Sequence, residues 1–213
     1  MEGAHDLGGM DGFGPVVTPD SDRPHEPGWE LRAQILTALG VGSARPWIER
    51  LDPATYLSSP YYGRWLAAAE LGTVSTGTLS REDLDRWRVA IEGGAAVPVA
   101  SNPELRDAIR HTMTHVHPMA RAAAPRFAVG DEIVVARRHD PVNHHRCPRY
   151  VRGVRGRIER ICGDAPATDG PAVGNPEAQY TVCFASMDLW GAQEGEAPFS
   201  VLVDLFEHYL EPA

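Results

Sequence analysis

The chain has 213 residues, of which 43% are hydrophobic and 23% charged, an ordinary composition for a globular protein with one large or two small domains. No apolar run is long enough to cross a membrane, and the N-terminal sequence lacks the basic and apolar regions of a signal peptide, so we expect a cytoplasmic protein. The net charge of −9 argues against a dedicated nucleic-acid binder, and three cysteines without a CxxC pair argue against a disulfide framework.

Residues 1–28 are rich in glycine, proline, aspartate and histidine and contain few apolar side chains. Such a segment cannot bury itself, so it is either disordered or lies on a partner. The apolar side chains of Met10, Phe13 and Val16 favour the second interpretation. We therefore predict that residues 1–28 form an extended arm on another protein.

Apolar residues then recur at helical spacing, which predicts a helical domain over residues 29–118. A first helix over 29–40 is expected to end at Gly40, and a second to begin near Arg45. A last helix is expected over 102–113, ahead of a linker-like stretch.

Capping residues mark three further helices in this domain. The marks are Asp52 before Pro53, Ser59 and Pro60 with a closing Gly72, and Ser80 with Asp83 as a capping box. The third helix would place Leu84, Trp87 and Ile91 on one side.

After Pro125 the apolar residues repeat with a period of two, which is typical of β-strands. Strands are predicted at 127–138, 150–161, 179–186 and 200–206, with a long loop over the breaker-rich residues 162–178. Because no helix is expected between these strands, residues 119–213 are predicted to form a small SH3-like barrel. The predicted fold class is therefore α+β.

One stretch, HHRCPRYVRGVRG at residues 144–156, contains two histidines, a cysteine and four arginines. The charge around it is uneven. Residues 126–160 hold nine arginines and four acidic residues, whereas residues 161–213 hold nine acidic residues and no arginine. This local concentration of positive charge needs an explanation.

Three interpretations of the stretch are open. His139, His144, His145 and Cys147 are types that bind transition metals, but neighbouring residues of a strand point to opposite faces, so we favour a polar loop with incidental histidines. Arginines beside Tyr150 suit a phosphate backbone, although the acidic residues that follow would repel it.

The third interpretation is an anion supplied by a partner protein. Arginine is permanently charged and weakly hydrated, and its fork grips an oxyanion through two hydrogen bonds. In this interpretation one or two of the arginines bind the anion, and the others are solvated or paired with the acidic C-terminal half. Composition alone does not choose among them.

Four motifs, in order along the whole chain, resemble the β subunit of nitrile hydratase. They are MEGAHDLGGMDGFGPV, WIERLDPATYLSSPYYGRWL, HHRCPRYVRGVRGRI and VLVDLFEHYLEP. The resemblance implies a chain that pairs with an α subunit, as an α2β2 heterotetramer, to hydrate a nitrile to the amide. It also implies that the α subunit holds Co(III), or alternatively Fe(III), with two of its cysteine ligands oxidised, while this chain binds no metal.

By position in these motifs, the resemblance implies that Arg45 and Arg146 hydrogen-bond the oxidised cysteines of the α subunit. Tyr61 and Trp65 would line the substrate pocket, and their i, i+4 spacing places them on one helix face. The segment before Arg45 is shorter than the family usually has, so that match depends on the register of RPWIERLDP.

Two relatives of this family are alternatives. A thiocyanate hydrolase or a nucleoside-nitrile hydratase splits the β-like halves over two chains, whereas both halves are fused here. A metallochaperone or activator of the family is expected to lack the complete N-terminal arm and the pocket motif, and this chain has both.

Overall fold

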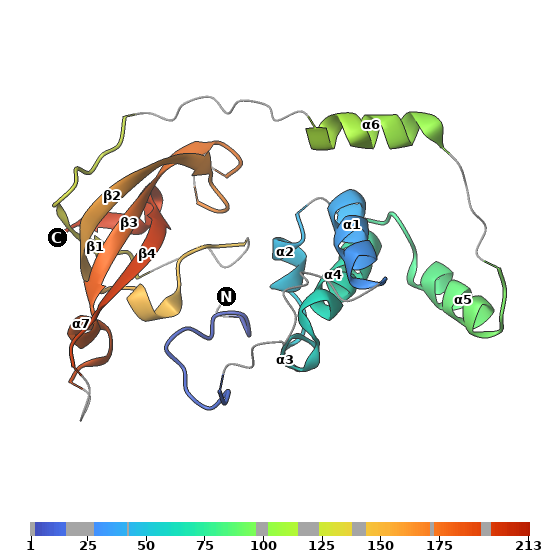
Figure 1. Ribbon diagram of the computed structural model, residues 1–213, viewed down its shortest axis with the longest axis horizontal. Coiled ribbons are helices and arrows are strands. Elements are labelled where there is room, and N and C mark those ends of the chain that lie inside the picture. Colours follow the sequence, from blue (N-terminus) through green and yellow to red (C-terminus); the bar gives the residue numbers. More distant parts are fainter. Residues whose placement is uncertain are drawn as a thin grey trace. The chain divides into compact units, whose positions relative to one another are not determined.

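A computed structural model describes most of the chain, in two compact units that comprise Pro15–His117 and Met1–Gly14 with Pro118–Ala213. The described residues are 3–15, 28–41, 43–96, 102–114, 124–137, 144–170, 173–192 and 197–213. Together the two units make an α+β protein, with helices in the first and an antiparallel sheet in the second (Figure 1). None of the helices in these ranges is long and apolar enough to span a bilayer.

The described residues of the helical unit form six α-helices. They are α1 (Glu30–Val41), α2 (Arg45–Ile48), α3 (Pro53–Ser58), α4 (Tyr61–Ser75), α5 (Arg81–Glu92) and α6 (Pro103–Thr114). Two predicted caps are confirmed. The Asp52 carboxylate accepts a hydrogen bond from the Thr55 amide at 3.0 Å, and Ser80 and Asp83 form the reciprocal capping box.

The helix ends differ from the predictions at two glycines. Helix α1 continues to Val41 past Gly40, and α4 continues to Ser75 past Gly72. Gly72 is buried together with Ala68 and Ala69, so this glycine allows close packing inside the helix and does not end it. The last helix, α6, also extends to Thr114, into the stretch predicted to be a linker.

Small side chains bring α1 and α4 together. Ala33 and Ala68 are almost completely buried, and the Thr37 hydroxyl donates to the Trp65 carbonyl at 2.9 Å and to the Ala33 carbonyl at 2.7 Å. A buried hydroxyl needs such an acceptor. The pairing fixes the backbone of α4 at Trp65, within the segment that carries the predicted pocket residues.

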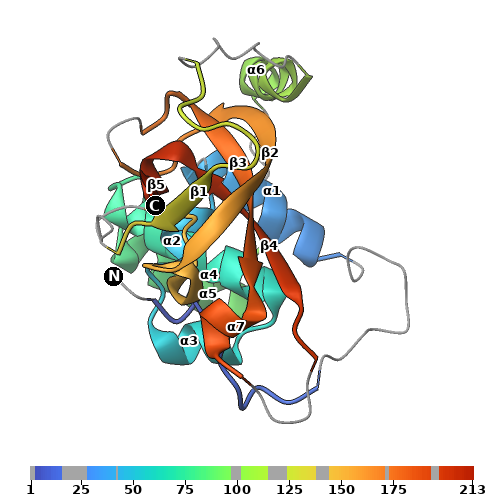
Figure 2. The ribbon, with the colours of Figure 1, turned by 90° about the vertical axis from the view of Figure 1, so that its left-hand side faces the viewer.

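The second unit is built on one five-stranded antiparallel sheet in the order β4-β3-β2-β1-β5 (Figures 1 and 2). Its strands are β1 (Glu132–Val135), β2 (Arg155–Pro166), β3 (Pro176–Ala185), β4 (Ser200–Phe206) and β5 (Leu210–Pro212). Three short helices accompany them, namely η1 (Arg149–Val151), α7 (Ser186–Trp190) and η2 (Glu207–Tyr209). The strand pairs of the described residues leave β4 and β5 as edges, so the sheet is not closed.

The residues predicted to form a long loop, 162–178, are largely paired strand. Strands β2 and β3 extend as a hairpin until Pro166 faces Pro176. The register shifts between Ile161 and Gly163, and Gly163 has a φ of +107°, so a bulge accommodates the breaker residues. The absence of helices between the strands was also predicted wrongly, because α7 separates β3 from β4.

The core of this unit lies on the sheet. Its fully buried side chains are Ile133, Val135, Val151, Ile158, Tyr180, Val182, Phe184, Leu205, Tyr209 and Leu210. Ile133 and Val135 of β1, and Tyr180, Val182 and Phe184 of β3, occupy alternate positions, as a half-buried sheet requires. The stretch 144–152 packs beside this core, because Cys147 and Val151 belong to it.

Candidate functional site

The N-terminal segment is bound to the arginine-rich stretch through Asp6. The Asp6 carboxylate accepts hydrogen bonds from the Arg149 amide at 3.1 Å and from the Arg152 guanidinium at 3.1 Å. Both side chains of the Asp6–Arg152 ion pair are nearly excluded from solvent. Arg152 also donates to the Cys147 carbonyl at 2.9 Å. The positive charge of Arg152 is therefore used in contacts within the chain.

Arg149 is engaged in the same way, because its guanidinium donates to the Asp6 carbonyl at 3.3 Å and lies 3.0 Å from the Met10 sulfur. The expectation that the surplus arginines pair with the acidic C-terminal half is wrong for this pair. Their partner is an aspartate more than 140 residues earlier in the sequence. A continuous track of unpaired guanidinium groups for a phosphate backbone is not present at Arg149 and Arg152.

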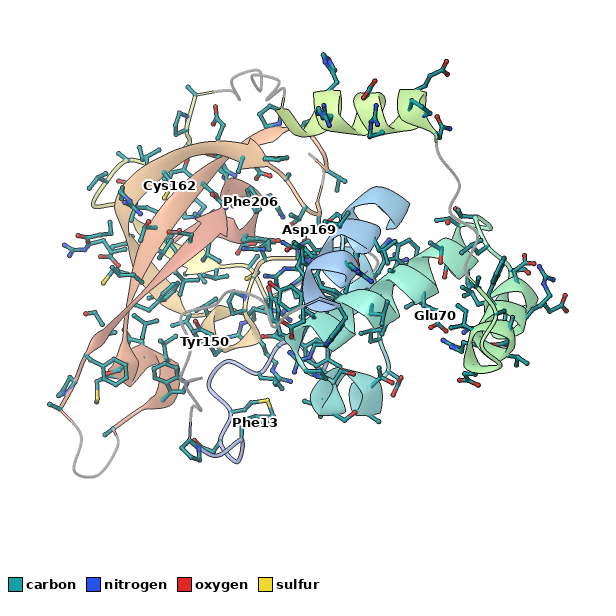
Figure 3. All side chains as sticks on the ribbon, turned by 45° about the vertical axis from the view of Figure 1, so that its right-hand side comes forward. Phe13, Glu70, Tyr150, Cys162, Asp169 and Phe206 are labelled. Atoms are coloured by element: carbon teal, nitrogen blue, oxygen red, sulfur yellow. The ribbon has the colours of Figure 1, made fainter. Side chains whose placement is uncertain are left out.

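Two glycines allow the N-terminal segment to lie close to the sheet unit. A Cβ at Gly8 would lie 2.5 Å from the Tyr150 ring, and one at Gly9 would lie 2.8 Å from the Trp190 indole nitrogen. Tyr150 faces this segment, whereas Phe13 projects from it (Figure 3). Met10 and Phe13 are about half exposed. Val16 lies outside the described residues.

Arg146 differs from its neighbours. Its amide donates to the Tyr209 hydroxyl at 2.9 Å, but its side chain is exposed and, in the part of the chain that the structure describes, has no hydrogen bond or ion pair. His144, His145 and Cys147 around it are buried. Among the described residues, the stretch thus presents two exposed guanidinium groups without a polar partner, those of Arg146 and Arg155, and of these Arg146 lies between two buried neighbours.

Burial also bears on the metal interpretation of this stretch. Burial raises the pKa of the Cys147 thiol to about 12, against the opposing charge of Arg152, so the thiolate that a metal needs is disfavoured. No group of three or more His, Cys, Asp or Glu suited to a metal occurs among the described residues. His139 lies outside them.

A second set of predicted residues meets in the helical unit. Arg45 begins α2, and Tyr61 and Trp65 lie one turn apart on α4 with their ring centroids 6.2 Å apart. All three line one hollow, together with Ile48, Tyr56 and Arg64. Like Arg146, the Arg45 side chain is exposed and has no polar partner within the described ranges.

Arg64 is a lining residue that the sequence reading missed. Its Nε donates to the Tyr56 carbonyl at 2.7 Å, and its guanidinium carbon lies 4.4 Å from the centre of the Tyr56 ring. This contact joins α3 to α4 and forms one wall of the hollow. The available signal was its position three residues after Tyr61, on the same helix face.

A buried polar network behind Arg146 was missed as well. Tyr209 donates to the Asp169 carboxylate, and the His208 imidazole lies 3.3 Å from Asp169 and 2.8 Å from Glu177. Asp169 comes from the connection between β2 and β3 (Figure 3). Nothing local in the sequence signals this network, because the adjacent His208 and Tyr209 meet Asp169 and Glu177 from 31 to 40 residues earlier in the chain.

The charges of the network support one another. Burial by itself would raise the pKa of Asp169, but the close contact with His208, its charge and the hydrogen bond from Tyr209 outweigh burial and lower that pKa. Burial would likewise lower the pKa of His208, yet its hydrogen bonds and charge interactions with Asp169 and Glu177 raise it. A protonated His208 between two carboxylates is consistent with both directions.

Fold and site together define an α+β protein in which Arg45 and Arg146 are exposed, the first beside aromatic residues and the second beside a buried polar network. Family models for the nitrile hydratase beta subunit match it at both ends, the N-terminal model over residues 1–115 and the C-terminal model over residues 117–212. The chain therefore belongs to the nitrile hydratase beta-subunit family.

Two nitrile hydratase beta subunits are similar to this chain over nearly its whole length. A nitrile hydratase subunit beta from Rhodococcus sp is 34% identical over 99% of this chain and 95% of its own, and a cobalt-containing nitrile hydratase subunit beta from Pseudonocardia thermophila is 33% identical over 99% and 96%. A thiocyanate hydrolase subunit alpha from Thiobacillus thioparus is 32% identical, but over 43% of this chain and 75% of its own. The full-length relatives are thus beta subunits.

Proposed function

We propose that this chain is the β subunit of a nitrile hydratase, which hydrates a nitrile to the corresponding amide only as a complex with an α subunit. The observation that carries the proposal is the Arg146 guanidinium, which is exposed and has no polar partner among the described residues, between the buried His145 and Cys147 and with its amide donating to Tyr209. An unpaired guanidinium on a fixed backbone is suited to an anion from another chain.

In this proposal Arg146 and Arg45 bind the oxidised metal-ligand cysteines of the α subunit. A sulfenate or sulfinate is an oxyanion that further oxidation would destroy. Two hydrogen bonds from a planar guanidinium fix the orientation of its oxygens and restrain the ligands from outside the coordination sphere. Lysine would supply the charge without this geometry.

Tyr61 and Trp65 are proposed to form an aromatic wall of the substrate pocket. They line one hollow together with Arg45. Tyr61 is 59% exposed and stands on the well-formed helix α4. An exposed aromatic side chain beside an unpaired arginine can contact an apolar ligand that binds near an anion. A small nitrile has an apolar body and one polar end, which suits such a wall.

The proposed metal is cobalt, with iron as the alternative, and the α subunit would hold it. Relatives whose names include cobalt support this choice. The residues of this chain fit a role beside such a centre, since Arg45 and Arg146 offer guanidinium groups without a polar partner and no ligand cluster occurs, both statements applying to the described ranges. When bound, the metal supplies Lewis acidity toward the nitrile.

For the assembly we propose an α2β2 heterotetramer in the cytoplasm, with residues 1–28 as an arm on the α subunit. The half-exposed Met10 and Phe13 are available for such a contact. We further propose that residues 119–213 form an SH3-like barrel and residues 29–118 the helical domain. Two features support the barrel. Strands β1 to β4 pair in sequence order with the last strand, β5, beside β1, and the short helix η2 precedes β5.

The alternatives are a subunit of a related thiocyanate hydrolase or nucleoside-nitrile hydratase, and a non-catalytic metallochaperone of the family. The half-length match to a thiocyanate hydrolase subunit favours the fused β subunit over the first. Co-purification separates the second, because an enzyme subunit holds a stoichiometric, metal-containing α partner whereas a chaperone exchanges its partner.

The proposal is tested by co-expressing the chain with its α subunit and comparing Arg146→Lys with Arg155→Lys. Arg155 is an exposed arginine of the same stretch that belongs to β2. We expect the first change to reduce turnover strongly while metal content and assembly remain, and the second to have little effect. Unchanged turnover in Arg146→Lys would remove this residue from the site.

A further inference from the structure

The backbone at Arg146 is restrained far more than its side chain. The residues on both sides, His145 and Cys147, are 7% and 1% exposed, whereas the Arg146 side chain is exposed. The Arg146 amide donates to the Tyr209 hydroxyl at 2.9 Å, which is the one hydrogen bond of Arg146 within the described residues. The hydrogen bond that holds the Arg146 amide is thus accepted by a tyrosine of η2, the short helix before β5.

Tyr209 can accept this hydrogen bond because its own proton is directed elsewhere. A tyrosine hydroxyl has one proton to donate, and Tyr209 donates it to the Asp169 carboxylate, which can only accept. The oxygen lone pairs are then available to the Arg146 amide. Burial raises the pKa of Tyr209, and its hydrogen bond to Asp169 raises it further, so the hydroxyl keeps its proton.

Asp169 is itself held in place. It is 2% exposed, and the His208 imidazole lies 3.3 Å from its carboxylate. The other side of the imidazole lies 2.8 Å from Glu177, whose carboxylate also accepts from the His208 amide at 2.6 Å. These contacts connect the β2–β3 hairpin to η2 and hold the hydroxyl of Tyr209 at one orientation.

We propose that Tyr209 is a positioning residue for Arg146, with Asp169 fixing the orientation of the Tyr209 hydroxyl. This inference rests on the proposed role of Arg146. Loss of the hydroxyl would free the Arg146 backbone and spread the guanidinium over several directions. A group that must meet an oxyanion at hydrogen-bond distance then spends less time in the productive geometry.

The first experiment compares Tyr209→Phe with Tyr180→Phe in the co-expressed αβ complex. Tyr180 is a matched control, since it is equally buried in the same core and its hydroxyl bonds Glu207 and the Phe127 amide, away from Arg146. We expect Tyr209→Phe to lower kcat about tenfold with KM changed less than about twofold. Tyr180→Phe should retain wild-type kcat.

A double-mutant cycle shows whether Tyr209 acts through Arg146. In an Arg146→Lys background, Tyr209→Phe should lower kcat less than about twofold further, because the group that it positions is already lost. An independent readout is amide hydrogen exchange of the peptide containing Arg146 in the assembled complex, which should become about tenfold faster in Tyr209→Phe and stay unchanged in Tyr180→Phe.

The outcomes are distinguishable. A full tenfold loss from Tyr209→Phe in the Arg146→Lys background, or unchanged exchange at Arg146, would overturn the positioning role while leaving the proposed function intact. Wild-type kcat in Arg146→Lys itself would overturn the proposed role of Arg146, and no nitrile hydration by the unmutated αβ complex would overturn the proposed function. Equal losses in Tyr209→Phe and Tyr180→Phe would show that the effect comes from general loosening of the core, and would also overturn the positioning role.

Discussion

The carboxylate of Asp6 and the guanidinium of Arg152 lie 3.1 Å apart, and their side chains are 6% and 11% exposed. This buried ion pair joins the N-terminal segment to the stretch that carries Arg146. Removal of one partner of a buried pair leaves the other charge without compensation, which is costly. The pair therefore both anchors the segment and restrains the candidate site.

Asp6→Ala should lower the free energy of unfolding by about 3 kcal/mol and make the N-terminal segment sensitive to proteases, because Arg152 and the Arg149 amide lose their buried acceptor. Asp11→Ala is the control, since Asp11 belongs to the same segment and is exposed. Urea unfolding and limited proteolysis measure both effects. Equal behaviour of the two variants would contradict a structural role for the buried pair.

Trp65→Ala should lower kcat/KM for an aromatic nitrile at least tenfold, a loss of about 1.4 kcal/mol of transition-state binding, if its indole forms a wall of the pocket. The packing of α1 on α4 should survive, because Thr37 bonds the carbonyl rather than the indole of Trp65. Trp87→Ala on α5 is the matched control, as this tryptophan is 41% exposed and does not line the hollow. A similar loss of kcat/KM in both variants would argue against Trp65 as a wall of the pocket.

His208 should make stability depend on pH. Its pKa is raised in the folded protein by Asp169 and Glu177, so its stabilisation is fully present below the ordinary value of 6.5 and is lost as the pH rises through the folded pKa. The midpoint of thermal unfolding of the complex should therefore fall between pH 6 and pH 8.5. The fall should be smaller in His208→Gln and unchanged in His111→Gln, whose histidine is exposed on α6.

The titration of Asp169 should affect the stability of the protein at acidic pH. Its pKa is lowered, so its contribution is present above the usual carboxyl value and is lost as the pH falls through the folded pKa.

For the His208 prediction, the contradicting outcome is a wild-type unfolding midpoint that rises from pH 6 to pH 8.5 more than that of His208→Gln. This result would be incompatible with the charged network described above.

The cysteines should differ in their reaction with a thiol reagent at pH 8. Cys162 is exposed, whereas Cys147 is 1% exposed with a pKa raised by burial to about 12, so it supplies very little thiolate. Mass spectrometry after brief labelling should find Cys162 modified and Cys147 intact until the protein is unfolded. Rapid modification of Cys147 in the folded protein would reopen the interpretation of this stretch as a reactive or metal-binding loop.

The sequence by itself determined the local features of this protein. The caps at Asp52 and at Ser80 with Asp83, and the strand Ser200–Phe206, were predicted correctly, because the interactions that specify them lie within a few residues. The order of four motifs was sufficient to identify the family. The helix end at Gly72 was predicted wrongly, since the packing of α4 against α1 uses small residues inside the helix, and α1 also ends one residue after the predicted Gly40.

Only the tertiary structure decided which of the clustered arginines is available for a partner. Arg149 and Arg152 bond Asp6, 143 and 146 residues away, and Tyr209 bonds Asp169 across 40 residues. Such pairs form when the folded sheet brings distant segments together and removes water from between their charges, so no local pattern predicts them. Arg146 stays exposed between the buried His145 and Cys147, and we propose that it is the arginine of this stretch that a neighbouring subunit binds.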